Sequence, residues 1–327
     1  MIRIIDSTLA MMDRFEWLPD QIADFCSLMK SIGILDLEIS EDIYGKMGEL
    51  PEGIRLYMMI GMPEKRHDYP GIYKFLHQKG IPGEDLICQL QINDIREVIQ
   101  IKSYQDYACL RIKGLDDMIC HKYSGIMKNI KENAGKARII FCPENSFGCA
   151  TALAVQWILD GNNEISTSFT GIGNRAATEE VLMALRISSR YKVNQDLSPL
   201  IRLKEMFEDV TTERVSPNKP VIGEAIFEFE AGVHVDGIIK NPSNFVPFLP
   251  EQVGRKFGIR VGKHSGKNAV IYKLGEAGIK MEEEKDILAI LSEVKKQGSD
   301  LKRGLKDVEF LSIVNEVCAD EGKKMDS

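Results

Sequence analysis

Short apolar segments alternate with longer amphipathic stretches along the first 190 residues. The short segments are rich in β-branched and aromatic residues and predict seven buried strands: 2–6, 34–39, 54–60, 86–91, 108–113, 138–142 and 164–169. The longer stretches predict helices between them: 18–31, 70–79, 93–105, 121–133, 148–160 and 177–191. Strands that alternate with helices are typical of parallel α/β folds.

Two parallel architectures fit this order of elements. A TIM-type βα barrel has eight strands and carries its active site at their carboxyl ends. With seven strands counted, the pattern predicts a barrel short by one βα unit. A doubly wound sheet is the alternative, and hydrophobic periodicity alone does not choose between them.

The chain changes character after residue 192, where a stretch rich in Pro, Gly and Asn precedes two helical patterns near 282–297 and 306–318. We therefore expect a degenerate βα barrel over 1–195. A linker or extended arm should follow over 196–245, and a small α/β-helical subdomain should occupy 246–327.

Composition narrows the class of protein. A formal net charge of -7 argues against a general nucleic-acid binder. No apolar run reaches the roughly 20 residues that span a bilayer, and the N-terminus does not resemble a signal peptide, so we expect a cytoplasmic protein. The seven cysteines form no C-x-x-C pair, which favours free thiols over a disulfide framework or a zinc ribbon.

The five histidines lie far apart in the sequence, so no local pair can ligate a metal. His234 lies in "AGVHVDG", where a loop imidazole beside Asp236 suits general acid–base catalysis or a structural hydrogen bond to the backbone equally well. His264 lies in "VGKHSGK", a cluster that suits an anion or simply packs the subdomain.

Polar residues also follow several predicted strands. Glu38 and Asp6 end the second and first strands, where a carboxylate suits either an active site or an ion pair. The segment "RIIFCPENSFG" places Cys142 and Glu144 after another strand. One thiol beside one carboxylate is a poor hard-cation site, and no base that would activate the thiol as a nucleophile is evident.

These segments together resemble one family of metal-dependent, acyl-CoA Claisen-condensing barrels: isopropylmalate, citramalate and homocitrate synthases. The motifs that carry the resemblance are "GVHVDGIIKNPSNF", "LPEQVG", "RVGKHSGKNAV" and "NSFGCATALAVQWILDGNNEISTSFTGIG". The nearest branch is the nitrogen-fixation homocitrate synthases. The family resemblance implies a TIM barrel, acetyl-CoA and a 2-oxo dicarboxylic acid such as 2-oxoglutarate as substrates, and Mg or Mn as the metal.

The chain departs from that family at every metal ligand. The family's His-x-His is here Cys142-Pro143-Glu144, and its first-strand Arg-Asp pair is here Ala10-Met11. The asparagine expected in the loop after the eighth strand has no counterpart. We therefore expect no metal bound by this chain, with Cys142 and Glu144 as the only residual candidates.

The resemblance implies an arm-bearing, omega-type subunit of a split synthase, inactive alone and active as part of an acyltransferase complex. The implied partner is a paralogue with an intact barrel, or a second copy joined through the C-terminal arm. His234 and Asp236 are the implied catalytic residues. The implied substrate-binding residues are Asp6, Thr8, Glu38, Asn145, Thr170 and His264. A non-catalytic barrel scaffold and a metal-free enzyme that uses Cys142 or Glu144 are the alternatives.

Overall fold

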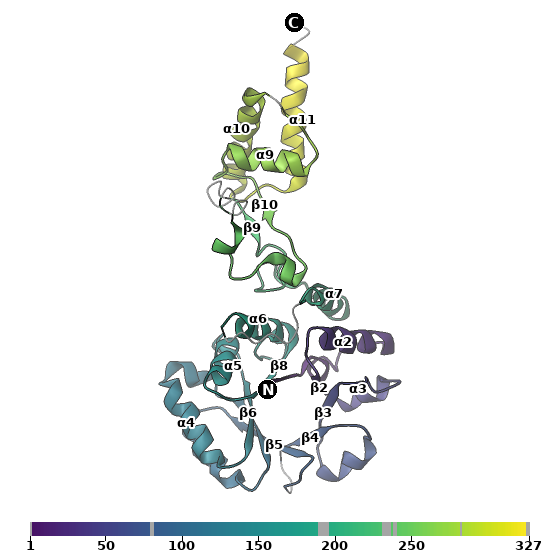
Figure 1. Ribbon diagram of the computed structural model, residues 1–327. Helices are drawn as coiled ribbons and strands as arrows, with labels where there is room; N and C mark the ends of the chain where they lie inside the picture. The colour runs from purple at the N-terminus through teal and green to yellow at the C-terminus, as the bar shows by residue number, and fades with distance from the viewer. Residues whose placement is uncertain are drawn as a thin grey trace. The chain divides into compact units, whose positions relative to one another are not determined.

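The computed structural model describes residues 2–78, 82–188, 196–230, 237, 241–281 and 283–324, with side chains to residue 319. The chain forms two compact units (Figure 1). One comprises Met1–Ser216 with Pro220–Ile222, and the other Pro217–Lys219 with Gly223–Ser327. Each is described by itself below.

The first unit is a closed barrel of eight parallel strands in sequential order, in which β1 pairs with both β2 and β8. This confirms the βα barrel and excludes the doubly wound sheet. The strands are β1 (Arg3–Asp6), β2 (Asp36–Ile39), β3 (Arg55–Met59), β4 (Lys74–His77), β5 (Leu86–Ile92), β6 (Cys109–Gly114), β7 (Arg138–Pro143) and β8 (Glu164–Thr167).

The expected loss of one βα unit is wrong for the strands. The segment Lys74–His77, inside the helix expected over 70–79, is strand β4 and pairs with β3 and β5. The connections between the strands, which normally contain helices, are shortened instead. The connection from β3 to β4 contains only a 3-10 helix, η1 (Pro63–Asp68), and just eight residues separate β4 from β5.

Helices cover the rest of the barrel wall. Five of them have ten or more residues: α2 (Pro19–Ser31), α4 (Tyr123–Ala134), α5 (Ala150–Leu159), α6 (Thr178–Ser188) and α7 (Pro199–Thr211). Two are short: α1 (Thr8–Met11) and α3 (Glu41–Lys46). Helix α7 lies in the range expected as a linker and contacts α2.

The helix expected over 93–105 is the 3-10 helix η2 (Ile95–Tyr104). Its buried residues are Val98 and Ile101, three positions apart. That spacing matches the three-residue turn of a 3-10 helix. The remaining 3-10 turns of the barrel are η3 (Asp116–Cys120) and η4 (Phe169–Gly171).

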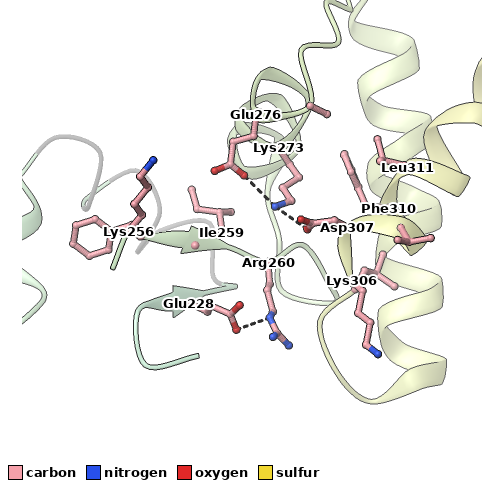
Figure 2. A pocket seen from close by; sticks show the side chains of 15 residues that line it. Glu228, Lys256, Ile259, Arg260, Lys273, Glu276, Lys306, Asp307, Phe310 and Leu311 are labelled. Carbon is pink, nitrogen blue, oxygen red and sulfur yellow. Dashed lines mark hydrogen bonds and ion pairs between the residues drawn. The ribbon is translucent and has the colours of Figure 1, made fainter. Parts of the chain in front are cut away.

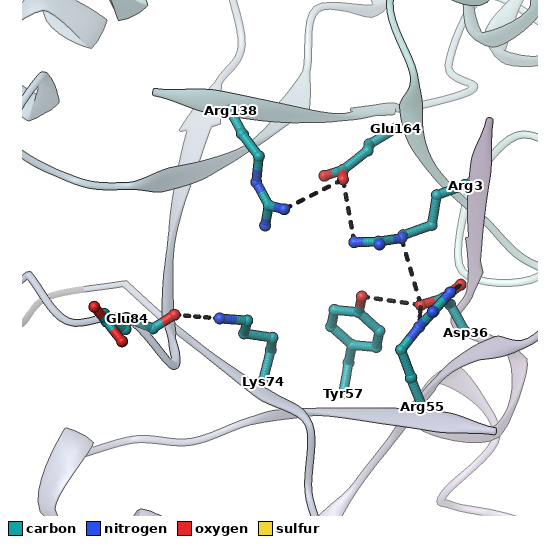
Figure 3. A network of polar contacts seen from close by, with 8 residues as sticks. All are labelled: Arg3, Asp36, Arg55, Tyr57, Lys74, Glu84, Arg138 and Glu164. Carbon is teal, nitrogen blue, oxygen red and sulfur yellow. Dashed lines mark hydrogen bonds and ion pairs between the residues drawn. The ribbon is translucent and has the colours of Figure 1, made fainter. Parts of the chain in front are cut away.

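A polar network closes the amino-terminal end of the barrel (Figure 3). Asp36 receives hydrogen bonds from Arg55 at 2.6 and 2.7 Å and from the Tyr57 hydroxyl at 3.0 Å. Arg3 donates to Glu164 at 3.2 Å, and Arg138 lies 3.7 Å from the same carboxylate. The arginines are partly exposed, so this end of the barrel is in contact with water.

The second unit packs three helices against a small parallel sheet. It contains β9 (Glu228–Phe229), η5 (Pro242–Asn244), η6 (Pro250–Val253), β10 (Gly258–Ile259), α9 (Lys267–Glu276), α10 (Glu284–Leu301) and α11 (Asp307–Lys324). Its core comes from all three helices and includes Val261, Val270, Ile290, Phe310 and Ile313. No helix among the described residues is long and apolar enough to cross a membrane.

Candidate functional site

A cavity of about 450 Å³ opens at the carboxyl ends of the barrel strands. The residues that line it come from β2, β3, β5 and β6, from the short helices α1 and α3 with the residues next to them, and from the loop after β8. The charged residues Glu38, Arg111, Lys113 and Arg175 are among them. This is the end of a βα barrel at which active sites form.

Glu38 and Arg111 form a buried ion pair across the cavity floor. Both side chains are about 98–99% buried, and both guanidinium NH groups of Arg111 donate to the carboxylate. Ser7 Oγ donates to the same carboxylate at 2.7 Å, and Arg111 Nε donates to Gln89 Oε1 at 2.7 Å. Burial alone would raise the pKa of Glu38, but Arg111, together with Arg175 and Ser7, outweighs it and lowers this pKa to about 2.

Asp6 is held beside this pair by hydroxyl and amide groups. It accepts hydrogen bonds from the Thr178 hydroxyl and from the Thr8 amide at 2.9 Å. Thr8 Oγ1 in turn accepts from the Phe169 amide at 2.7 Å, which joins β1 to the turn after β8. Burial raises the pKa of Asp6; the hydrogen bonds from Thr178 and Thr8 oppose this shift, and the negative charge of Glu38 adds to it.

Positively charged side chains of the chain itself contact the two residual candidates for metal ligands, Cys142 and Glu144. Arg175 donates a hydrogen bond to Cys142 Sγ, and both side chains are buried. Lys113 Nζ lies 2.9 Å from Glu144 Oε1, and Gln91 donates to Glu144 Oε2 at 2.9 Å. Burial opposes the charge of Arg175, but Cys142 and the nearby carboxylates raise its pKa above the usual value.

The donor set does not fit Mg²⁺ or Mn²⁺. Within the described residues no cluster of three or more His, Cys, Asp or Glu side chains could hold a metal ion. Met11 packs against Gly173, where an added Cβ would lie 2.7 Å from the methionine sulfur. A thioether, a thiol and a lysine-bound carboxylate are poor ligands for hard cations, which take oxygen donors.

Two of the expected substrate-binding residues have structural partners. Asn145 Oδ1 accepts a hydrogen bond from the Ala150 amide at 2.9 Å at the start of α5. Thr170 has a φ of 60°, and its amide donates to Glu179 Oε2 at 3.0 Å. Neither residue lines the cavity. Cys142 is fully buried and does not line it either, so the thiol is not presented as a nucleophile.

The expected catalytic residues His234 and Asp236 lie outside the described residues. His264, in the second unit, is exposed, and its amide donates to Glu230 Oε1 at 3.1 Å. The neighbouring Lys267 forms an ion pair with Glu284 at 2.5 Å. The "VGKHSGK" segment is therefore tied to its own unit by these contacts.

Sequence reasoning missed Arg111, Lys113 and Gln89. The available signal was their alternation in buried strands: Arg111 and Lys113 are two residues apart in β6, so both point to the same side of the strand. A buried cation needs a partner. The partner of Arg111 is Glu38, which lies 73 residues away in the sequence.

The fold defines the class of protein first. The structure is similar to hydroxymethylglutaryl-CoA lyase from Pseudomonas aeruginosa, with a TM-score of 0.50 and 12% identity over 65% of this chain and 93% of that chain. This likeness shows a TIM-barrel fold.

The family follows from the sequence comparisons. Residues 221–302 match the family model "Homocitrate synthase post-HMGL domain-like". The chain is 31% identical to "Homocitrate synthase, omega subunit" of Clostridium pasteurianum, over 96% of this chain and 95% of that protein. It is 37% identical to homocitrate synthase AksA of Methanocaldococcus jannaschii, over 61% of this chain but only 49% of that protein. The chain belongs to the homocitrate synthase family.

Proposed function

We propose that this chain is one subunit of a hetero-oligomeric homocitrate synthase, an acyltransferase complex that condenses acetyl-CoA with 2-oxoglutarate. In this arrangement a second polypeptide of the family supplies the metal-bearing barrel. This chain supplies His234 as the acid–base group and Asp236 beside it. As the family resemblance implies, the complex would be cytoplasmic and would provide homocitrate for nitrogen fixation.

One observation carries the proposal. The side chains at the positions that would have to hold the metal are contacted by an arginine and a lysine of the same chain. Arg175 binds Cys142, and Lys113 binds Glu144. In metal-assisted condensation the ion polarises the 2-oxo group of the acceptor. A barrel that cannot hold the ion needs a second barrel that can.

The second unit supports the other half of the proposal. The family-model match over 221–302 contains His234, Asp236 and His264. The similar protein from Clostridium pasteurianum is named an omega subunit, which suggests more than one kind of chain in that enzyme. This chain joins a post-barrel unit that matches the family model to a barrel without metal ligands. That combination fits an enzyme in which one chain supplies the metal site and the other supplies the acid–base group.

The decisive experiment measures release of free CoA from acetyl-CoA and 2-oxoglutarate with Mn²⁺. Three samples are compared: this chain alone, a family member with an intact His-x-His barrel alone, and their mixture. We expect turnover from the mixture far above the sum of the two separate samples. Full activity of this chain alone would contradict the proposal.

A matched pair of variants tests the role of His234. His234→Ala in this chain should lower kcat of the mixture by about 10²–10⁴-fold, the usual contribution of general acid–base catalysis. His67→Ala, an exposed histidine of the barrel, should leave kcat unchanged. Co-sedimentation of the two chains separates loss of catalysis from loss of assembly. Equal activity of both variants would remove His234 from the mechanism.

A further inference from the structure

A cavity of about 660 Å³ lies entirely within the second unit (Figure 2). Its lining carries four cationic and three anionic side chains. Arg260 lies 2.6 Å from Glu228, and Lys273 lies 3.0 and 2.9 Å from Glu276 and Asp307. The charges of this cavity are therefore nearly balanced and favour no class of ligand. A groove in the wall of the barrel unit differs in this respect.

The groove in the barrel wall lies between α2 and the loop 47–54, which joins α3 to β3. We call it the α2 groove. Helix α3 ends after six residues, whereas α2 has thirteen, so the chain returns to β3 as a loop beside α2. The volume of the α2 groove is about 530 Å³, within the range of binding pockets, roughly 300–1,000 Å³. It shares no residue with the cavity at the carboxyl ends of the strands.

One face of α2 lines the α2 groove along the whole helix. The lining residues from this helix are Pro19, Asp20, Ile22, Ala23, Cys26, Ser27 and Lys30. Spacings of three and four residues place side chains on one face of a helix. At 1.5 Å per residue, the stripe from residue 19 to residue 30 is about 16 Å long. The α2 groove is therefore elongated, and its shape suits a row of side chains from a second helix packed along α2.

Apolar side chains form much of this lining. Ile22 and Cys26 are only 1% and 2% exposed, whereas Ala23 is exposed and Leu50 is 39% exposed. Burial raises the pKa of the Cys26 thiol to about 12, so the thiol stays neutral and adds to the apolar surface. A docked helix would remove the exposed apolar surface of Ala23 and Leu50 from water, which is favourable.

The loop side of the α2 groove is fixed by contacts within the chain. Lys30 Nζ donates a hydrogen bond to the Glu52 carbonyl at 2.7 Å and ties the loop to the last turn of α2. Leu50 packs against Gly71, where an added Cβ would overlap the leucine side chain. A groove that is already formed loses little conformational entropy when it binds a partner.

The charges of the α2 groove are mainly negative. Asp20, Glu49 and Glu52 are exposed and have no ion pair within the described part of the chain. The one cation of the lining is Lys30, whose ammonium group already donates to a backbone carbonyl. Three carboxylates and one ammonium group favour a cationic partner. A second copy of this chain has a formal net charge of -7 and is disfavoured for the same reason.

We propose that the α2 groove binds a basic amphipathic helix of another polypeptide. Apolar side chains on one face of that helix pack on Ala23 and Leu50. Lysines or arginines beside this face meet Asp20, Glu49 and Glu52. This interaction does not rest on the reaction proposed above, because the α2 groove is separate from the barrel cavity.

The test uses a fluorescein-labelled helical peptide with leucines along one face and lysines on both sides of that face. Fluorescence anisotropy measures its binding to the full chain. We expect saturable binding and slower hydrogen exchange of residues 47–54. Two control peptides address the two recognition elements. One has the same composition with its leucines spread around the helix, and the other has glutamate in place of lysine. Neither should bind saturably.

Paired variants assign the charges. Glu49→Lys/Glu52→Lys should weaken binding of the peptide about tenfold, and Glu49→Asp/Glu52→Asp should keep it within about twofold. Asp106→Lys/Glu132→Lys, at exposed positions elsewhere on the barrel unit, should change nothing. Equal weakening by the two charge-reversed pairs would show attraction to the net charge of the chain rather than to the α2 groove, and would overturn the proposal.

A second pair of variants tests the groove itself. Ala23→Trp places a large side chain in the α2 groove and should abolish binding, whereas Ala23→Ser should preserve it. Urea unfolding verifies that both variants remain folded. Absence of saturable binding, equal binding of either control peptide, or full binding by Ala23→Trp would overturn the proposal. So would self-association of the chain that Ala23→Trp abolishes, because a second copy would then be the occupant.

Discussion

The two ends of the barrel both carry networks of arginine and carboxylate groups, but in different solvent environments. At the carboxyl end, Arg111 and Glu38 are 1% and 2% exposed. At the amino end, Arg55 and Arg138 are 39% and 50% exposed. Charge pairs in water contribute little to stability, whereas a buried charge that loses its partner is costly. Loss of the arginine should therefore be costly at Arg111 and have little effect at Arg138, where the guanidinium is half exposed.

The largest effect is expected for Arg111→Gln, which leaves the Glu38 carboxylate buried without its guanidinium. We expect the free energy of unfolding to fall by about 3–5 kcal/mol. Urea unfolding followed by tryptophan fluorescence measures it, because Trp17 and Trp157 both lie in the barrel unit. The double variant Glu38→Gln/Arg111→Gln should recover much of the loss. Additive losses would show that the two side chains do not act as a pair.

The pH dependence of stability should follow from the same pair. The pKa of Glu38 is lowered from 4.5 to about 2 in the folded barrel, so the unfolded chain binds the extra proton between these values. The contribution of Glu38 is complete above pH 4.5 and is lost as the pH falls towards 2. Its size is about 3 kcal/mol. Glu38→Gln should flatten this part of the unfolding profile. An unchanged slope would mean that other carboxylates control it.

A smaller effect is expected for Thr178→Val, which removes the hydroxyl that donates to Asp6. A hydrogen bond to a buried charged group contributes about 1.5–3 kcal/mol, so a loss near 2 kcal/mol is expected. Thr178→Ser keeps the hydroxyl and serves as the control in the same urea experiment. A loss in Thr178→Ser but none in Thr178→Val would indicate that methyl packing, not the hydrogen bond, is responsible.

The smallest effect is expected for Arg138→Gln at the base of the barrel. Arg138 is half exposed, and Glu164 keeps its hydrogen bond to Arg3. We expect a loss below about 1 kcal/mol. The substitution is chemically identical to Arg111→Gln, so the pair measures the contrast between the two ends directly. Similar losses at both ends would remove that contrast.

The sequence predicted the barrel and its carboxyl-end chemistry to different extents. Seven strands were found because their β-branched runs are locally distinct. Strand β4 was missed because "KFLH" is too short to show a period, and only its pairing with β3 and β5 makes it a strand.

The residue types alone lead to the expectation that this barrel holds no metal ion. They do not predict which side chains pair with one another at the carboxyl end of the barrel. The contacts of Arg111 with Glu38 and of Arg175 with Cys142 join residues 73 and 33 positions apart. Such contacts depend on strand register and barrel closure, which no local pattern contains.

The Arg175–Cys142 contact has a consequence for any attempt to build a metal site into this barrel. A histidine placed at position 142 would remove the thiol that accepts from the buried Arg175 guanidinium, and one placed at position 144 would remove the carboxylate that pairs with Lys113. Each single substitution is therefore expected to destabilise the barrel before an ion could bind. In the split synthase proposed above, these two contacts would keep the barrel free of metal and leave catalysis to depend on the partner chain.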